Sequence, residues 1–130
     1  MNAEIERDFV DQYICKRRRD RIWHELTHEK KRKNAIGRFC HRVEEFIDPR
    51  KVIYQGTDME ECVEWIHKFN EEECYIISWD ESEDGIIYGA LEAIDRMWDN
   101  GMASIAVGKK CCMIKTEQEI GAPEWYVLKK

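Results

Sequence analysis

Residues 51–79, KVIYQGTDMEECVEWIHKFNEEECYIISW, decide the fold, because they read as a strand, a helix and a second strand. The second strand, 74–79, is a nearly continuous apolar run, which is typical of a buried strand. Between the strands, residues 59–69 repeat apolar side chains at helical spacing, and Thr57-x-x-Glu60 predicts a capping box at the helix start. Such a unit predicts two parallel strands joined by a right-handed crossover.

Helix and strand patterns continue on both sides of this unit. Residues 3–28 predict helix, but their apolar side chains change face, so we expect either two helices broken near Arg17–Asp20 or one helix with a change of buried face. A further helix over 30–47 ends at Asp48-Pro49, because proline cannot continue the hydrogen-bond ladder. Beyond residue 79 the patterns predict a helix over 87–99 with Leu91, Ile94 and Trp98 facing inward, and strands at 102–107, 111–116 and 125–128.

The element order predicts an α/β fold, with α+β as the alternative. Two N-terminal helices are expected to pack on a small mixed sheet, built from a βαβαβ unit with a C-terminal antiparallel edge. The length fits a single domain over 1–130, with a basic helical part at 1–48 and an acidic α/β part at 49–130. The sequence has no apolar run long enough for a bilayer and no signal-peptide pattern at its start, so we expect no membrane association and a cytoplasmic location.

Six cysteines are present without a C-x-x-C pair, and we expect them to be reduced, small apolar side chains rather than a disulfide framework or a zinc site.

Charge is distributed unevenly along the chain. Residues 1–51 contain 14 Lys and Arg against 10 Asp and Glu, whereas residues 52–130 contain 7 against 17. The basic residues are concentrated between Lys16 and Arg42, and clusters of this kind neutralise phosphates in nucleic-acid-binding proteins. The competing interpretation is a solvated face that pairs with the acidic half of the same chain. The candidate basic binding residues are Arg17, Arg18, Arg21, Arg38 and Arg42.

The most specific motif is His24-Glu25-Leu26-Thr27-His28, which resembles the zincin signature H-E-x-x-H of zinc metalloproteases over these five residues. Histidines four apart on a helix can bind one zinc ion, and the glutamate between them can activate a zinc-bound water. Charged residues follow the motif and no strand precedes it, unlike the zincin pattern. The ordinary alternative is a solvated helix end with two titratable histidines, so we expect neither a metal nor any other cofactor.

The second motif is the acidic loop Asp80-x-Ser82-x-Asp84-Gly85, which resembles the start of a calcium-binding loop. Its twelfth position is Leu91 instead of the bidentate glutamate, which favours an ordinary Asp-Gly turn. Ligands of open α/β sheets bind beyond the carboxyl ends of the strands. The acidic side chains expected at that edge, and therefore the acidic binding candidates, are Asp58, Asp80, Glu81 and Asp84.

These patterns predict a small non-enzymatic binding protein that acts through a stoichiometric protein partner, as an inhibitor, adaptor or immunity-type protein. The strongly acidic second half would speed encounter with a basic partner. Two alternatives remain open: nucleic-acid binding through the helices between Lys16 and Arg42, and zinc-dependent hydrolysis by His24, Glu25 and His28. A homodimer is compatible with each of them.

Overall fold

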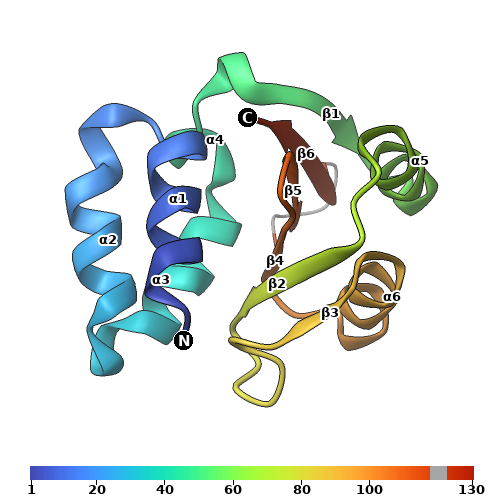
Figure 1. Ribbon diagram of the computed structural model, residues 1–130. Coiled ribbons are helices and arrows are strands. Elements are labelled where there is room, and N and C mark those ends of the chain that lie inside the picture. The colour runs from blue at the N-terminus through green and yellow to red at the C-terminus, as the bar shows by residue number, and fades with distance from the viewer. Residues whose placement is uncertain (118–122) are drawn as a thin grey trace.

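The computed structural model describes residues 1–117 and 123–130. It has three layers, with a six-stranded sheet between a layer of N-terminal helices and a pair of helices on the opposite face (Figure 1). The expected mixture of helix and sheet is therefore confirmed. The N-terminal layer contains α1 (Ala3–Tyr13), α2 (Arg19–Thr27), α3 (Glu29–His41) and α4 (Val43–Phe46). The sheet contains β1 (Val52–Gly56), β2 (Glu73–Ser78), β3 (Ile87–Gly89), β4 (Ser104–Val107), β5 (Cys111–Lys115) and β6 (Trp125–Lys129), and the opposite layer contains α5 (Met59–Phe69) and α6 (Ala90–Asn100).

The strands follow the order β1-β6-β5-β4-β2-β3, and all five neighbouring pairs of described strands are antiparallel. The prediction of parallel neighbours in a mixed sheet is wrong. Four antiparallel steps separate β1 from β2, so these two strands do run in the same direction, as the crossover through α5 predicts. However, β4, β5 and β6 lie between them. After β2, the unpredicted short strand β3 reverses the chain, and α6 then returns it so that β4 lies antiparallel to β2.

The N-terminal segment forms two helices rather than one helix with a change of buried face. The break after α1 is held by backbone contacts to the end of α4: Ile14 forms an isolated antiparallel bridge with Ile47, and the Cys15 amide donates to the Phe46 carbonyl at 2.7 Å. The helix expected over 30–47 is itself divided at Arg42, whose φ and ψ of −136° and 48° are not helical. These breaks allow several short helices to cover one face of the sheet.

Two apolar cores lie on the two faces of the sheet, as alternation along its strands requires. On β2, Tyr75 and Ile77 pack against the N-terminal helices, whereas Cys74 and Ile76 pack against α5 and α6. All six cysteines are free, in agreement with the expectation. Burial raises the pKa of Cys62 and Cys74 to about 12, so these thiols stay protonated at neutral pH.

The two helices of the opposite layer correct two details of the sequence analysis. Asp58, rather than Thr57, caps α5, and its carboxylate accepts a hydrogen bond from the Glu60 amide at 2.9 Å. In α6, Ile94 is buried as expected, but Leu91 and Trp98 are 45% and 47% exposed. The buried side chains of α6 are Ala90, Ala93, Ile94 and Met97.

A buried network of charges joins the N-terminal helices to the sheet. The carboxylate of Glu6 is fully buried and accepts hydrogen bonds from both terminal nitrogens of Arg32, at 2.6 and 2.8 Å, and from the Tyr75 hydroxyl at 2.6 Å. Arg32 also donates to both carboxylate oxygens of Asp84, at 2.7 and 2.9 Å. Burial lowers the pKa of Arg32, but these hydrogen bonds raise it overall, so the guanidinium stays charged.

We expect Arg32→Met to lower the free energy of unfolding by about 3–5 kcal/mol, because it leaves the Glu6 carboxylate buried without its counter-ion. Urea unfolding followed by circular dichroism measures this change. The matched control is Arg42→Met, which removes an exposed ion pair to Glu45 at 3.8 Å and should cost at most about 0.5 kcal/mol. Equal effects of the two substitutions would show that the network does not hold the layers together.

Candidate functional site

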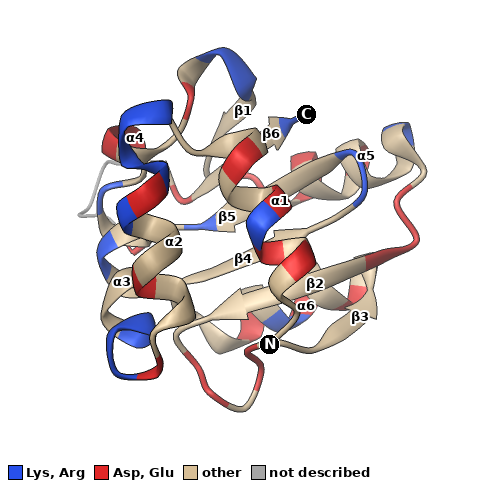
Figure 2. Ribbon diagram, turned by 60° about the vertical axis from the view of Figure 1, so that its left-hand side comes forward, with Lys and Arg blue, Asp and Glu red and all other residues tan. Residues whose placement is uncertain are grey.

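Most of the basic residues proposed from the sequence as binding residues already interact with other side chains of the same chain. Figure 2 shows that most of the Lys and Arg positions lie on the N-terminal helical layer, together with several acidic positions. Arg21 and Arg38 both pair with Glu25, at 3.2 and 2.6 Å. Arg42 pairs with Glu45, and the guanidinium of Arg18 lies 5.1 Å from the ring centroid of Phe46. Of the five candidate arginines, Arg17 alone is exposed without an ion pair in the described part of the chain.

The remaining basic side chains do not form one continuous stripe. Lys16 and Arg17 precede α2, whereas Lys30 and Lys31 follow it, and none of these four makes an ion pair with a described residue. Since α2 has 9 residues and a helix rises about 1.5 Å per residue, the two groups lie at opposite ends of a segment about 14 Å long. These four basic side chains between Lys16 and Lys31 are thus divided into two separate groups.

The H-E-x-x-H motif does not form the arrangement that a zinc site requires. The helix α2 ends at Thr27, so His28 is a non-helical C-cap with φ and ψ of −103° and 110°. The exposed rings of His24 and His28 lie 6.0 Å apart, and the carboxylate of Glu25 is occupied by the two arginines. Within residues 1–117 and 123–130, no group of three or more His, Cys, Asp or Glu side chains is placed to hold a metal ion.

The acidic candidates divide into one loop and one distant helix cap. Since β1 and β2 run in the same direction, Asp58 and the loop after β2 lie at the same end of the sheet. Three strands separate them, which corresponds to about 19 Å between β1 and β2. The structure thus brings together Asp80, Glu81 and Asp84 and leaves Asp58 apart.

Within the loop, two of the three carboxylates stabilise the loop itself instead of converging on an open cation site. Asp80 accepts hydrogen bonds from the Ser82 amide and hydroxyl, at 2.9 and 2.8 Å, which lower its pKa together with a hydrogen bond from Asn100. Asp84 is bound by Arg32 and accepts from the Ser78 amide at 3.0 Å. Glu81 is exposed and lies 3.7 Å from the Lys33 ammonium.

The face formed by α5 and α6 carries an uncompensated negative charge. Residues 57–101 contain 14 Asp and Glu but only Lys68 and Arg96 as basic residues. Lys68 lies 4.7 Å from the ring centroid of Trp65, and Arg96 is paired with Glu83 and Glu92 at 3.0 and 3.2 Å. The acidic positions that are exposed on these helices, and make no ion pair with a described residue, are Glu60, Glu64, Asp95 and Asp99.

The sequence analysis did not single out these four carboxylates. Their signal is the i,i+4 spacing of Glu60 with Glu64 and of Asp95 with Asp99, which places each pair on the outer side of its helix. Like charges at this spacing repel each other, and only Glu60, in the first turn of α5, has a compensating interaction with the dipole of its own helix.

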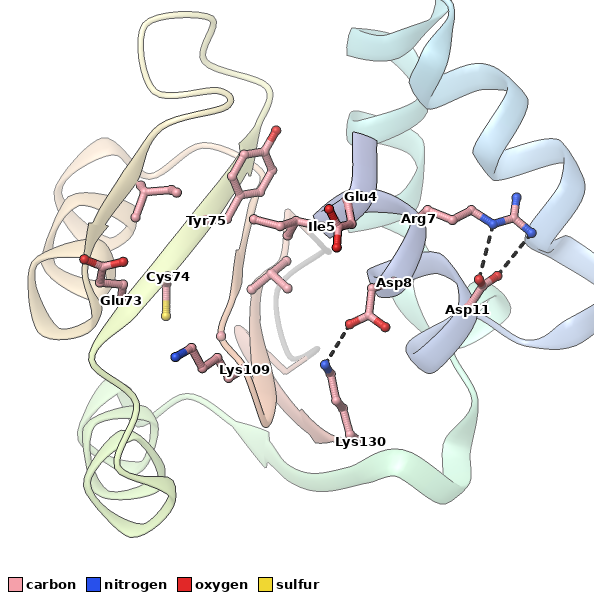
Figure 3. A pocket seen from close by; sticks show the side chains of 13 residues that line it. Glu4, Ile5, Arg7, Asp8, Asp11, Glu73, Cys74, Tyr75, Lys109 and Lys130 are labelled. Carbon is pink, nitrogen blue, oxygen red and sulfur yellow. Dashed lines mark hydrogen bonds and ion pairs between the residues drawn. The ribbon is translucent and has the colours of Figure 1, made fainter. Parts of the chain in front are cut away.

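A groove of about 570 Å³ lies on the other face of the sheet, between α1, the β2–β3 hairpin and the β4–β5 turn (Figure 3). Apolar side chains of Ile5, Ile87 and Val107 line it, and Glu73 and Lys109 lie along one margin. On the α1 side, ion pairs join Asp8 to Lys130 at 2.7 Å and Arg7 to Asp11 at 3.2 Å. Cys74 also borders this groove, but its side chain packs against α5 and α6 on the opposite face of the sheet, and burial raises the pKa of its thiol to about 12.

Comparisons with known proteins do not assign a function. No protein-family model, no curated protein and no solved structure matches this chain. Among the described helices, none combines the length and the apolar composition needed to cross a membrane.

We expect Glu25→Gln to lower the free energy of unfolding by about 1–2 kcal/mol at pH 7, because Gln cannot provide the charged acceptor that Arg38 and Arg21 require. Burial raises the pKa of Glu25, but the two arginines lower it by a larger amount. The pKa of Glu25 in the folded protein is therefore below its ordinary value of 4.5. A carboxylate with a lowered pKa stabilises the fold above that ordinary value, and this stabilisation is lost as the pH falls through the folded-state pKa.

The difference between Glu25→Gln and the unsubstituted protein should therefore narrow below about pH 4.5, when measured by urea unfolding from pH 7 to pH 3. Glu64→Gln, at an exposed position without an ion pair to a described residue, should show no such narrowing. A difference for Glu25→Gln that grows on acidification would contradict the role assigned to the arginines.

Proposed function

We propose that this chain is a non-enzymatic binding protein, and that the acidic face of α5 and α6 contacts a basic protein partner. The observation that supports this proposal is the difference in charge compensation between the two helical layers. On the N-terminal layer, arginines such as Arg21, Arg32 and Arg38 are neutralised by carboxylates of the same chain. On the opposite layer, exposed carboxylates have no such partners among the described residues.

Uncompensated charge on one face favours association more than it favours folding. Carboxylates at Glu60, Glu64, Asp95 and Asp99 repel one another in the isolated protein, and a basic surface placed against them relieves that repulsion. Complementary potentials also steer two proteins toward each other and raise the association rate, which makes encounter sensitive to ionic strength. A face of this kind therefore suits a protein that must find and hold one basic target.

The other two functions predicted from the sequence have less support. Nucleic-acid binding requires basic side chains that are free to contact phosphates, whereas most of the candidate arginines are engaged inside the protein. Zinc-dependent hydrolysis requires a third ligand and a free general base, whereas Glu25 is held by two guanidinium groups.

Charge reversal on the acidic face should abolish partner binding. The test variant carries Glu60→Lys, Glu64→Lys, Asp95→Lys and Asp99→Lys, and each protein is used to recover partners from nuclease-treated extract of the source cell. The unsubstituted chain should retain one basic protein at a stoichiometric ratio. With the purified partner, the test variant should associate about 100-fold more slowly at low salt, since steering is reversed.

The matched control carries four opposite reversals on the N-terminal layer, Lys16→Glu, Arg17→Glu, Lys30→Glu and Lys31→Glu, and should retain the partner. Retention of the partner by the acidic-face variant would overturn the proposal. A parallel recovery from untreated extract that yields nucleic acid, together with a protein that nuclease treatment removes, would also overturn the proposal and would support the basic helices instead.

A further inference from the structure

The tryptophans of this chain share a pattern of contact with basic side chains. The chain has five tryptophans, and a Lys or Arg of the chain itself lies near the ring of every one except Trp98. Such contacts are attractive because the face of an indole ring carries a negative potential. The distances from the cationic group to the ring centroid are 5.2 Å for Arg7 and Trp23, 4.7 Å for Lys68 and Trp65, 3.9 Å for Lys33 and Trp79, and 5.7 Å for Lys115 and Trp125.

Trp98 differs from the other four tryptophans in the contacts of its ring and in the charge of its neighbouring residues. It is 47% exposed in the last turn of α6, and no basic side chain of the described residues lies over its ring. Leu91, 45% exposed, lies on the same side of α6 seven residues earlier, about 10 Å along the helix axis. Asp95 lies between them, three residues before Trp98, and Asp99 follows directly.

Arg96, the basic residue of α6 itself, does not contact the ring of Trp98. Arg96 precedes Trp98 by two positions, so the two side chains leave the helix on opposite sides. Its guanidinium lies 4.2 Å from the ring centroid of Tyr88 and is paired with Glu83 and Glu92. Among the described residues, no cation therefore lies beside the exposed indole ring of Trp98 or the carboxylate of Asp95, although a cation suits both.

We propose that Trp98 and Asp95, one helical turn apart, form a receptor for an arginine side chain of the basic partner, and that Leu91 contacts an apolar side chain beside it. The proposal rests on the proposed function and specifies the chemistry of the partner. Arginine fits better than lysine, because a planar guanidinium stacks on the indole face while its edge donates paired hydrogen bonds to a carboxylate.

The spacing of the receptor defines the shape of the partner segment. The distance of about 10 Å between Leu91 and Trp98 equals two helical turns, so a helix that carries an arginine and a leucine seven residues apart matches both contacts. Exposed Trp and Leu side chains with an acidic rim also have the composition of an interface centre, where aromatic anchors contribute most of the affinity.

Two synthetic helical peptides of equal length and charge test the arginine receptor against the full chain. One has an arginine seven residues from a leucine and the other has lysine in place of that arginine. Titration into the ¹⁵N-labelled protein, up to millimolar peptide, should shift the indole N–H signal of Trp98. The arginine peptide should bind about 10-fold more tightly than the lysine peptide, since stacking on tryptophan is added to charge attraction.

Trp98→Ala should remove this preference, lowering the affinity for the arginine peptide by about 10-fold and that for the lysine peptide by less, because lysine loses the cation–ring attraction but has no planar stacking to lose. The matched control is Trp79→Ala, because Trp79 is 37% exposed but already has Lys33 over its ring, and it should keep the preference. Thermal unfolding of both variants confirms that they are folded.

The outcomes separate the two proposals. Equal binding of the two peptides, lost only on reversal of Glu60, Glu64, Asp95 and Asp99, overturns the arginine receptor and leaves the acidic face as the binding surface. Binding to neither peptide at millimolar concentration, or binding that the four reversals do not weaken, overturns both. An arginine preference that survives in Trp98→Ala overturns the receptor alone.

Discussion

Arg32 occupies the position on which the arrangement of the layers depends. Its side chain extends from α3, and the guanidinium donates hydrogen bonds both to the buried carboxylate of Glu6 on α1 and to Asp84 in the loop after β2. Two carboxylates share one guanidinium, and the Tyr75 hydroxyl and Ser78 amide supply the remaining donors. A buried carboxylate is tolerated only with complete pairing, so this set of contacts fixes α1 and α3 in one register over the sheet.

The same network explains why the basic half of the sequence is a poor guide to its partners. Several arginines of the basic segment form ion pairs within the chain that join the helices to each other and to the loop. Arg32 pairs with Glu6 and Asp84, and both Arg21 and Arg38 pair with Glu25. The acidic half lacks equivalent partners, because its two helices lie on the far face of the sheet, away from those arginines (Figure 1). Net charge by segment thus overstated the number of basic side chains that lack a partner in the same chain, and the acidic surface as a binding site stays a prediction.

Local patterns predicted much of the secondary structure. The turn from Asp80 to Gly85 and the end of the helical segment at Asp48-Pro49 follow from glycine and proline, whereas periodicity left open whether the first segment is broken near Arg17–Asp20. Strand neighbours did not follow, because the three residues Ile87–Gly89 are too few for a periodic signal, and they reverse the chain before α6. The candidate site was predicted only in its sign of charge. Glu60, Glu64, Asp95 and Asp99 look ordinary along the sequence, and their lack of counter-ions is a property of the folded arrangement.

The position of Trp98 follows from the packing of α6 and not from its hydrophobicity. An assignment by apolar spacing turns Leu91, Ile94 and Trp98 toward the sheet. The structure instead turns Ala90, Ala93 and Met97 inward beside Ile94, because small side chains let the helix approach β2 and β4 closely. Trp98 then lies outward beside Asp95, and about half of its surface stays exposed to solvent. In our proposal, a cationic side chain of the partner covers this exposed half and pairs with the neighbouring carboxylate.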